Sequence, residues 1–175
     1  KCWNWFSVAD QQRDQGEPAL IAGITRQVMQ DYPVDPQRVY VAGLSAGGAA
    51  AAVMGATYPD LYAAIGVHSG LAHGAATDIP SAFAAMQRGG AAVASTVRSA
   101  TSPRIVPTIV FHGDSDTTVS PRNGDQVIAQ ARSAIGADFQ ATATAQQGQV
   151  LGGRSYRRTL HADATGRPVL EHWVI

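Results

Sequence analysis

The sequence predicts an α/β fold with an open, mainly parallel sheet and flanking helices. Three observations support this prediction. Short β-branched and aromatic runs alternate along the chain with longer helical patterns. The run 62–67 is almost continuously apolar, which is typical of a strand buried on both faces of a parallel sheet. Polar loops follow two of the predicted strands, and the carboxyl ends of strands are where such sheets carry their sites.

Composition indicates one domain and excludes several classes of partner. The 175 residues are enough for one domain with a full core, and 13 basic and 13 acidic residues balance to zero net charge. Neither a nucleic-acid partner nor an anionic membrane surface is therefore indicated, and no apolar run approaches the ~20 residues that cross a bilayer. No Cys/His pair has metal-ligand spacing, so no metal site is expected. The lone cysteine, Cys2, is expected to be buried and inert.

The predicted elements are, in chain order, a helix at 17–31, a strand at 39–41, a helix at 46–57, a strand at 62–67, a helix at 79–86, a strand at 105–111, a helix at 120–134 and strands at 154–161 and 168–174. The first helix starts with an acidic residue and a first-turn proline. Its residues Ile21, Ile24 and Val28 form a stripe at helical spacing, which indicates an amphipathic helix. Before it, the aromatic residues of 1–6 predict either core packing or the wall of a substrate cleft.

The later boundaries depend on glycine, proline and turn signals. Gly89-Gly90 ends a helix, and the stretch 91–102 has no firm period, so a loop or a weak helix is expected there. Pro107 is unusual within a strand because proline lacks a donor for the ladder. Residues 136–153 have little hydrophobic content and predict a loop. The turn sequence 163–166 joins the last two strands.

The sequence Gly43-Leu44-Ser45-Ala46-Gly47 lies between a predicted strand and a predicted helix. This is the G-x-S-x-G pattern of a nucleophile elbow. Such a turn strains the backbone of the serine, and Gly43 and Gly47 are expected to avoid clashes because they lack a Cβ. The turn also directs the Ala46 N–H toward a negative oxygen beside Ser45, as half of an oxyanion hole. A glycine-rich turn without chemistry is the alternative.

A second polar loop, 112–116, follows the strand 105–111. A serine nucleophile needs a histidine to take its proton and a carboxylate to orient that histidine, and in α/β-hydrolases the chain order is Ser, acid, His. Asp114 and Asp116 are both candidates for the acid. Asp114 is closer to the strand and could instead form hydrogen bonds with the loop backbone, as short carboxylates in turns commonly do.

None of the histidines can be assigned as the base. His161 closes a strand before a polar turn, where a surface position is expected. His172 alternates with Trp173 inside an apolar strand, where a structural role fits equally well. His68 and His112 lie at strand ends near the site but precede the acid in the chain, so a hydrogen-bonded supporting role is expected for both.

Four stretches of the chain resemble a known family: 2–6, 43–48, 58–64 and 111–119. They are similar to the poly(3-hydroxybutyrate) depolymerase-like esterases, which are secreted α/β-hydrolases grouped with feruloyl and acetylxylan esterases. The resemblance covers nearly the whole chain. It implies Ser45 as nucleophile, Asp116 rather than Asp114 as the acid, and an extracellular location. The substrate it implies is an ester, either a polyhydroxyalkanoate-type polymer or a plant cell-wall ester.

Two features of that family are missing from this sequence. One is a strand and HG-type loop before the Cys-Trp segment, which supplies the second oxyanion N–H and often a cysteine able to pair with Cys2. The other is a Gly-x-Gly-His-like stretch after a strand similar to 171–174. Because the first residue is Lys1 and not methionine, we expect the natural start to lie upstream. The chain thus resembles an internal fragment of one α/β-hydrolase domain, with the triad histidine expected beyond Ile175.

These observations together predict a serine esterase that transfers an acyl group to water. No cofactor is required, because the nucleophile, base and oxyanion donors are all protein groups. Loss of one triad member lowers kcat by ~10⁴ or more, so the 175-residue piece alone is expected to be nearly inactive. An acyltransferase on the same fold and a non-catalytic binding module are the alternatives.

Overall fold

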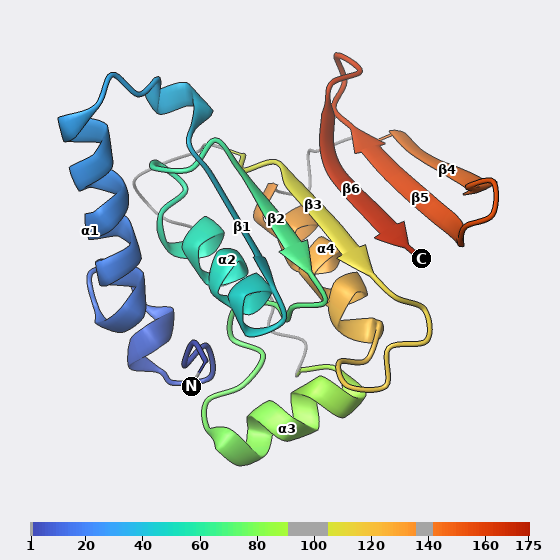
Figure 1. The fold of residues 1–175 in the computed structure, drawn as a ribbon, viewed down its shortest axis with the longest axis horizontal. Coiled ribbons are helices and arrows are strands. Elements are labelled where there is room, and N and C mark those ends of the chain that lie inside the picture. The colour runs from blue at the N-terminus through green and yellow to red at the C-terminus, as the bar shows by residue number, and fades with distance from the viewer. Residues whose placement is uncertain (1, 91–104, 136–141) are drawn as a thin grey trace.

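Six strands form one mixed sheet in the computed structural model, which describes residues 2–90, 105–135 and 142–175 (Figure 1). The strands are β1 (Tyr40–Leu44), β2 (Ala64–His68), β3 (Thr108–His112), β4 (Thr142–Gln149), β5 (Ser155–Ala162) and β6 (Pro168–Val174). Their order in the sheet is β1-β2-β3-β6-β5-β4. The first four strands in this order pair in parallel, and β5 and β4 continue the sheet as an antiparallel hairpin beside β6. The predicted, mainly parallel sheet is confirmed.

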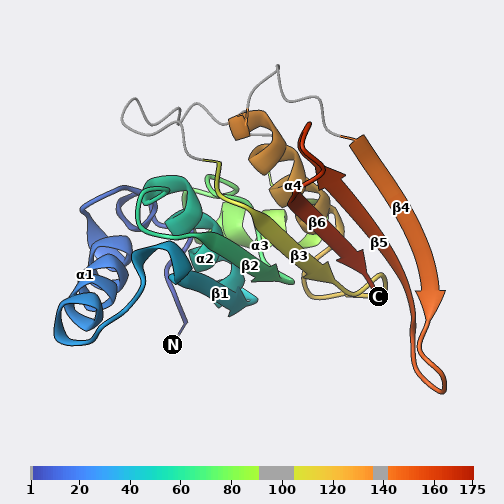
Figure 2. The ribbon, with the colours of Figure 1, turned by 90° about the horizontal axis from the view of Figure 1, so that it is seen from above.

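The helices are α1 (Gly16–Asp31), α2 (Ala46–Thr57), α3 (Ile79–Arg88) and α4 (Arg122–Ile135), with short 3-10 turns η1 (Ala9–Gln11) and η2 (Pro36–Arg38). α2 packs on β1 and β2, and α4 packs on β3 and β6. Figure 2 shows α2 and α4 on the same side of the sheet, with α1 beyond the edge strand β1. Among the described helices, none is both long enough and apolar enough to cross a membrane.

The core lies between the sheet and the helices α2 and α4. Val67, Val110 and Leu170 point toward these helices from β2, β3 and β6, and each is at most 1% exposed. Val127 and Ile128 of α4 complete the cluster. This continuous apolar packing is the burial expected of parallel strands, and it fixes the carboxyl ends of β1, β2, β3 and β6 relative to one another.

Helix α1 forms where it is predicted, but only Ile21 of its apolar stripe packs against the core. Ile24 is 66% exposed and Val28 is 45% exposed. The buried residues of α1 are Pro18 and Ala22, and Ala22 packs in a cluster with residues of α2 and the segment after it, including Met54. Small side chains at the contact let α1 lie close to α2, so the buried face is centred on Ala22 and leaves Ile24 and Val28 outside.

The loop predicted at 136–153 is wrong for residues 142–149, which form β4. β4 pairs along its whole length with β5, and its side chains are almost all exposed. The residues of β4 do not alternate between apolar and polar side chains, so the sequence pattern does not indicate a strand there. Residues 136–141 and the stretch 91–102, where a loop or weak helix is expected, lie outside the described residues.

The proline in the third strand is accommodated at the start of that strand. β3 begins at Thr108, directly after Pro107. The Pro107 carbonyl accepts a hydrogen bond of 2.9 Å from Ile65 N–H. The proline therefore supplies an acceptor to the ladder, and no donor is needed from it because it lies before the first residue of β3. The predicted turn between β5 and β6 is also present, with Gly166 at φ 83° and a hydrogen bond from its N–H to Asp163 O.

Candidate active site

Ser45 occupies the sharp turn between β1 and α2 in a strained conformation. Its φ is 56° and its ψ is −119°, a region that non-glycine residues rarely adopt. The Ser45 N–H donates to His68 O at 2.9 Å, and the Ser45 carbonyl accepts from Ala49 N–H at 3.0 Å. These two bonds hold the strained residue from both sides. The strained elbow predicted for Ser45 is confirmed, and its side chain is exposed at the edge of the sheet.

Of the two glycines in the elbow, only Gly43 is needed to avoid a steric clash. A Cβ on Gly43 would collide with the carbonyl group of Gly47. A Cβ on Gly47 would meet no atom closer than 3.9 Å, on the indole of Trp3, so the expected clash at Gly47 is wrong. Gly48 is the second constrained position, because a Cβ there would lie 3.0 Å from the carbonyl oxygens of Gly43 and His68.

Ala46 is the first residue of α2, and its N–H has no acceptor within the helix. The side chain of Ser45 forms no capping hydrogen bond with α2, so its hydroxyl is not engaged by the helix. The first turn of α2 contains no acidic residue. The partial positive charge of the helix N-terminus is therefore available for a negative oxygen that develops beside Ser45.

Hydrogen bonds beyond the strand ends bring the polar loops to one edge of the sheet. Ser69 N–H donates to Phe111 O at 2.9 Å, and Ile175 N–H donates to His112 O at 2.9 Å. Asp114 N–H in turn donates to Ile175 O at 2.9 Å. The ladder thus continues from β1 through β2 and β3 to β6, and the elbow and the loop after β3 share the carboxyl edge.

The side chain of Asp116 is held by the backbone of its own loop. Its Oδ1 accepts from Thr118 N–H and from Val119 N–H, both at 2.9 Å. Burial raises the pKa of Asp116, but the hydrogen bonds from Val119 and Thr118, with smaller contributions from Ser69 and His112, together lower it below its usual value of 3.8. Asp116 is therefore a carboxylate at neutral pH, fixed in orientation.

Asp114 does not form the bonds to loop backbone that the sequence suggested for it. Its side chain is exposed and accepts a hydrogen bond of 2.7 Å from the Ser115 hydroxyl. Asp116 takes that backbone role. The sequence analysis did not single out Ser69, which follows β2 at φ 47° and contributes to the lowered pKa of Asp116. Its place two residues after a predicted strand was the available signal.

Three of the histidines are buried against α4 on the helix-covered face of the sheet. His112 is 1% exposed, and His161 and His172 are each 8% exposed. The surface position predicted for His161 is therefore wrong: His161 pairs with Leu170 of β6 and shares its inward direction. Burial lowers the pKa of both His161 and His172. His112 forms the hydrogen bond expected of a supporting residue, with its Nε2 2.8 Å from Val119 O.

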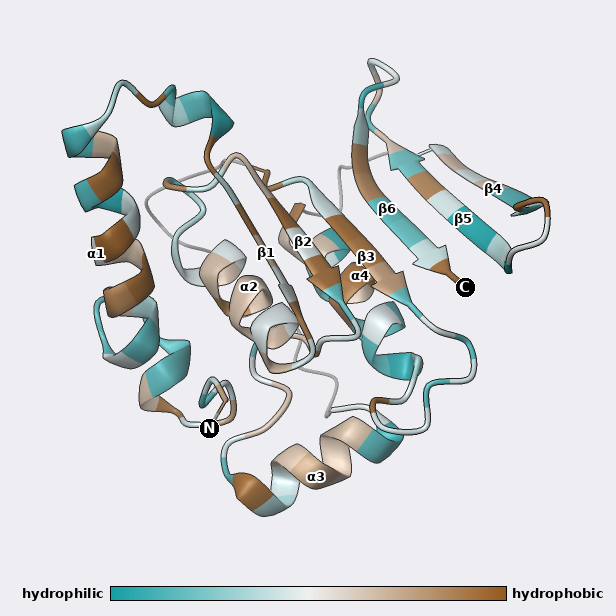
Figure 3. Ribbon diagram, viewed as in Figure 1, coloured by the Kyte–Doolittle hydropathy of each residue, from teal (hydrophilic) through white to brown (hydrophobic). Residues whose placement is uncertain are grey.

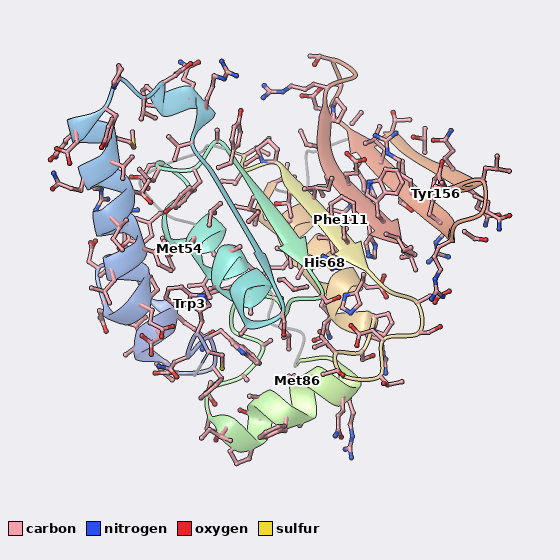
Figure 4. The ribbon with its side chains drawn as sticks, viewed as in Figure 1. Trp3, Met54, His68, Met86, Phe111 and Tyr156 are labelled. Atoms are coloured by element: carbon pink, nitrogen blue, oxygen red, sulfur yellow. The ribbon has the colours of Figure 1, made fainter. Side chains whose placement is uncertain are left out.

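His68 differs from these three because its ring is exposed at the end of β2 (Figure 4). Its ring centroid lies 6.3 Å from that of Phe111 on the neighbouring strand. Within the described ranges, no three His, Cys, Asp or Glu side chains come together in a way that could hold a metal ion.

The aromatic N-terminal segment confirms the predicted core packing for one of its tryptophans and leaves another exposed. Trp5 is 6% exposed and packs edge-to-face with Phe6 at 5.6 Å between ring centroids, so it belongs to the core. Trp3 is 43% exposed and lies over Gly47 at the start of α2, beside the elbow. Cys2 is exposed, so the burial expected for it is wrong.

A model of the protein family described as esterase PHB depolymerase matches residues 1–151, a range that contains the elbow and the acid loop. The chain belongs to this family. A poly(3-hydroxyalkanoate) depolymerase C from Paucimonas lemoignei is 34% identical to it over 185 residues, which cover 100% of this chain and 42% of the depolymerase. A feruloyl esterase B from Neurospora crassa is 31% identical over 154 residues, covering 79% of this chain and 52% of that esterase.

The fold of this esterase-family chain is also seen in a solved structure. An acetyl xylan esterase from Aspergillus awamori superposes with a TM-score of 0.79 and 24% sequence identity, over 99% of this chain and 65% of that structure. Together with the mainly parallel sheet and the strained serine elbow, this likeness shows that the chain has an α/β-hydrolase fold. The chain spans roughly half the length of the curated relatives named above.

Proposed function

We propose that the protein is a serine carboxylic ester hydrolase and that residues 1–175 form part of its α/β-hydrolase domain. Ser45 is the nucleophile, Ala46 supplies one oxyanion donor and Asp116 is the acid. The observation that carries this proposal is the strained backbone of Ser45, at φ 56°, between the strand β1 and the N-terminus of α2. Strain of this kind persists only when the surrounding structure enforces it, and it exposes the hydroxyl at the sheet edge.

The proposed reaction passes through an acyl-enzyme. The Ser45 oxygen attacks the ester carbonyl carbon while a histidine takes the hydroxyl proton. The carbonyl oxygen becomes negative in the tetrahedral intermediate and is stabilised by the Ala46 N–H together with a second donor. The C–O bond to the alcohol then breaks, and the histidine returns the proton to the leaving oxygen. Water repeats these steps on the acyl-enzyme and releases the carboxylic acid.

The base of this proposal is a histidine outside residues 1–175. His112, His161 and His172 are buried against α4, where their rings are shielded from the exposed hydroxyl of Ser45. The hydrogen bonds of Ile175 with His112 and Asp114 place that residue beside the acid loop. A histidine that follows Ile175 in a longer chain would enter the site next to Asp116, whose fixed carboxylate could orient it.

We propose a polyester of hydroxyalkanoic acids as the first substrate class to test. The depolymerase relative matches the whole chain, and Trp3 offers an exposed aromatic surface beside the elbow for an apolar acyl chain. Acetyl and feruloyl esters of plant cell-wall polysaccharides form the second class, because relatives with those names match most of the chain. An extracellular location, which the family resemblance implies, accompanies the proposal.

Labelling of the full-length protein with a fluorophosphonate probe tests the nucleophile. We expect one adduct on Ser45, located by mass spectrometry and abolished by Ser45→Ala. Ser133→Ala is the matched control, because Ser133 is exposed on α4 and its hydroxyl donates to Ala129 O. His68→Ala, which removes the exposed histidine near the site, should leave the labelling intact. A folded full-length protein that takes no label would refute the assignment and favour a binding module.

Product analysis then separates hydrolysis from acyl transfer. The full-length protein is incubated with a hydroxyalkanoate oligomer and, separately, with an acetylated xylan, each with and without an added alcohol. Free carboxylic acid as the main product in both the presence and the absence of alcohol supports the hydrolase. A new ester of the added alcohol as the main product would show that the protein is an acyltransferase.

A further inference from the structure

The acid loop is tied to the sheet by His112, the last residue of β3. Its Nε2 lies 2.8 Å from the carbonyl oxygen of Val119. Because a carbonyl oxygen only accepts, Nε2 carries the hydrogen of this bond. The N–H of the same Val119 donates to Asp116 Oδ1 at 2.9 Å. His112 therefore binds the carbonyl group of Val119, and Asp116 binds the N–H of the same residue. These two hydrogen bonds close the loop.

His112 also lies beside the carboxylate itself. Its Nε2 is 3.6 Å from Asp116 Oδ2, which is too long for a hydrogen bond but close enough for the ring to border the side chain. The two backbone donors bind Oδ1, and Oδ2 is the oxygen that the His112 ring borders. A rotation of the His112 ring would change both the loop closure and the space around Oδ2.

The ring of His112 is fixed from behind by α4. A Cβ on Gly124 would lie 3.0 Å from His112 Nδ1 and 3.1 Å from His172 Nε2, so α4 reaches this distance because residue 124 has no side chain. His112 and His172 are diagonal neighbours on β3 and β6, and His172 Nδ1 is 3.8 Å from the carboxylate of Asp125. The ring is therefore packed between the sheet and the helix.

Packing alone does not account for a histidine at this position. His112 is 1% exposed, and its Nδ1 has no hydrogen-bond partner among the described residues. A buried polar atom without a partner destabilises the folded state, and an apolar ring of similar size would avoid that cost. The hydrogen bond from Nε2 to Val119 is the feature that an apolar ring could not supply.

We propose that His112 is a positioning residue for Asp116: by donating its Nε2 hydrogen to Val119 O, it fixes the loop that aims the carboxylate. This inference rests on the proposed role of Asp116 as the acid. It gives a specific function to a histidine that lies in the polar loop but does not reach the nucleophile.

Kinetics of the full-length protein test the proposal. In His112→Phe we expect kcat to fall by about 10–100-fold, because a shift of the acid of about 1 Å is costly, with KM little changed. His112→Gln, whose side-chain N–H can replace the Nε2 hydrogen, should recover most of the rate. His161→Phe is the matched control, since His161 is buried on the same sheet face but lies two strands away from β3. It should leave kcat unchanged.

A second readout is independent of catalysis. The carboxyl carbon of Asp116 is titrated by NMR in the wild type and in each variant. Loosening of the loop weakens the hydrogen bonds from Val119 and Thr118, so the pKa of Asp116 should rise more in His112→Phe than in His112→Gln, which also loses the direct effect of the imidazole but keeps a donor for Val119. It should stay low in His161→Phe. If Ser45 takes no fluorophosphonate label, the proposed function fails, but this titration still decides whether His112 positions Asp116.

Three results would overturn the inference. The first is a folded His112→Phe variant with an unchanged Asp116 titration. The second is an equal loss of kcat in His161→Phe. The third applies even if His112→Phe fails to fold: a nitrogen-15 NMR spectrum of the wild type that places the His112 hydrogen on Nδ1 instead of Nε2.

Discussion

The parallel part of the sheet and the β4–β5 hairpin are built on opposite principles. β2 and β3 pack buried side chains against α2 and α4, whereas the side chains of β4 are almost all exposed. Figure 3 shows the contrast as mainly hydrophobic ribbon in β2 and β3 and mainly hydrophilic ribbon in β4. At the tip of the hairpin, Leu151 is fully exposed. The candidate residues Ser45 and Asp116 both follow strands of the parallel part.

The difference shows what a strained nucleophile needs from its surroundings. A residue such as Ser45 costs about 1–3 kcal/mol of backbone strain, so the structure around it must be determined by many other contacts. The parallel strands β1, β2 and β3, with the helices packed on them, provide these contacts and the ladder bonds that continue past the strand ends. The hairpin has no such task.

Removal of the acid charge should give the largest effect in the parallel part. In the full-length protein, Asp116→Asn keeps the size of the side chain but loses the charge that orients and stabilises the protonated histidine. We expect kcat for ester hydrolysis to fall by about 10⁴-fold. Steady-state kinetics on a soluble ester measure the change.

Asp114→Asn is the matched control for this prediction. Asp114 is in the same loop, but its exposed carboxylate accepts only the short bond from Ser115 among the described contacts. Its kcat should stay within about threefold of the wild type. An equal loss in both variants would mean that the loop needs both charges, and a loss confined to Asp114→Asn would reverse the assignment.

Truncation of one leucine in each part compares their contributions to stability. Leu170 on β6 is 0% exposed, and Leu170→Ala should lower the free energy of unfolding by about 2–5 kcal/mol through lost burial and the cavity it leaves. Leu151 at the hairpin tip is fully exposed, at 102%. Leu151→Ala should therefore change the free energy of unfolding by less than about 0.5 kcal/mol. Urea denaturation of the two variants gives both values. A large loss in Leu151→Ala would show that the tip has a partner in the folded protein.

Features set by local sequence could be predicted well. The elbow was predictable because the tight turn and its glycine at position 43 follow from sterics within five residues. The helix and strand positions in the parallel part were predictable because buried strands and capped helices have strong local patterns. The same is true of the acid loop, which directly follows a buried strand.

Features set by tertiary contacts could not be predicted in this way. The outward direction of Ile24 and Val28 depends on how closely α1 approaches α2. The burial of His161 depends on its register opposite Leu170. The strand β4 exists because β5 offers its edge, although its own composition indicates a loop. In each case the deciding partner is distant in sequence.

A drop in pH should have a smaller effect on stability than Leu170→Ala. It acts on β6, the strand that joins the parallel part of the sheet to the hairpin. His172 on β6 is buried, and burial is the main cause that lowers its pKa below 6.5, against a smaller opposing effect of Asp125. The unfolded chain therefore binds a proton near pH 6.5 that the folded chain resists, so stability falls as pH drops below about 6.5. The loss is complete below the folded pKa.

Urea denaturation between about pH 7.5 and pH 5 measures this loss, in a range above the 3.8 at which aspartates ordinarily titrate. His172→Gln removes the proton-binding group, so its stability should vary less with pH than that of the wild type. Leu151→Ala, which leaves every titratable group in place, should keep the wild-type slope. An unchanged slope in His172→Gln would show that the pH dependence arises from other groups, with the neighbouring buried His161 the next to replace.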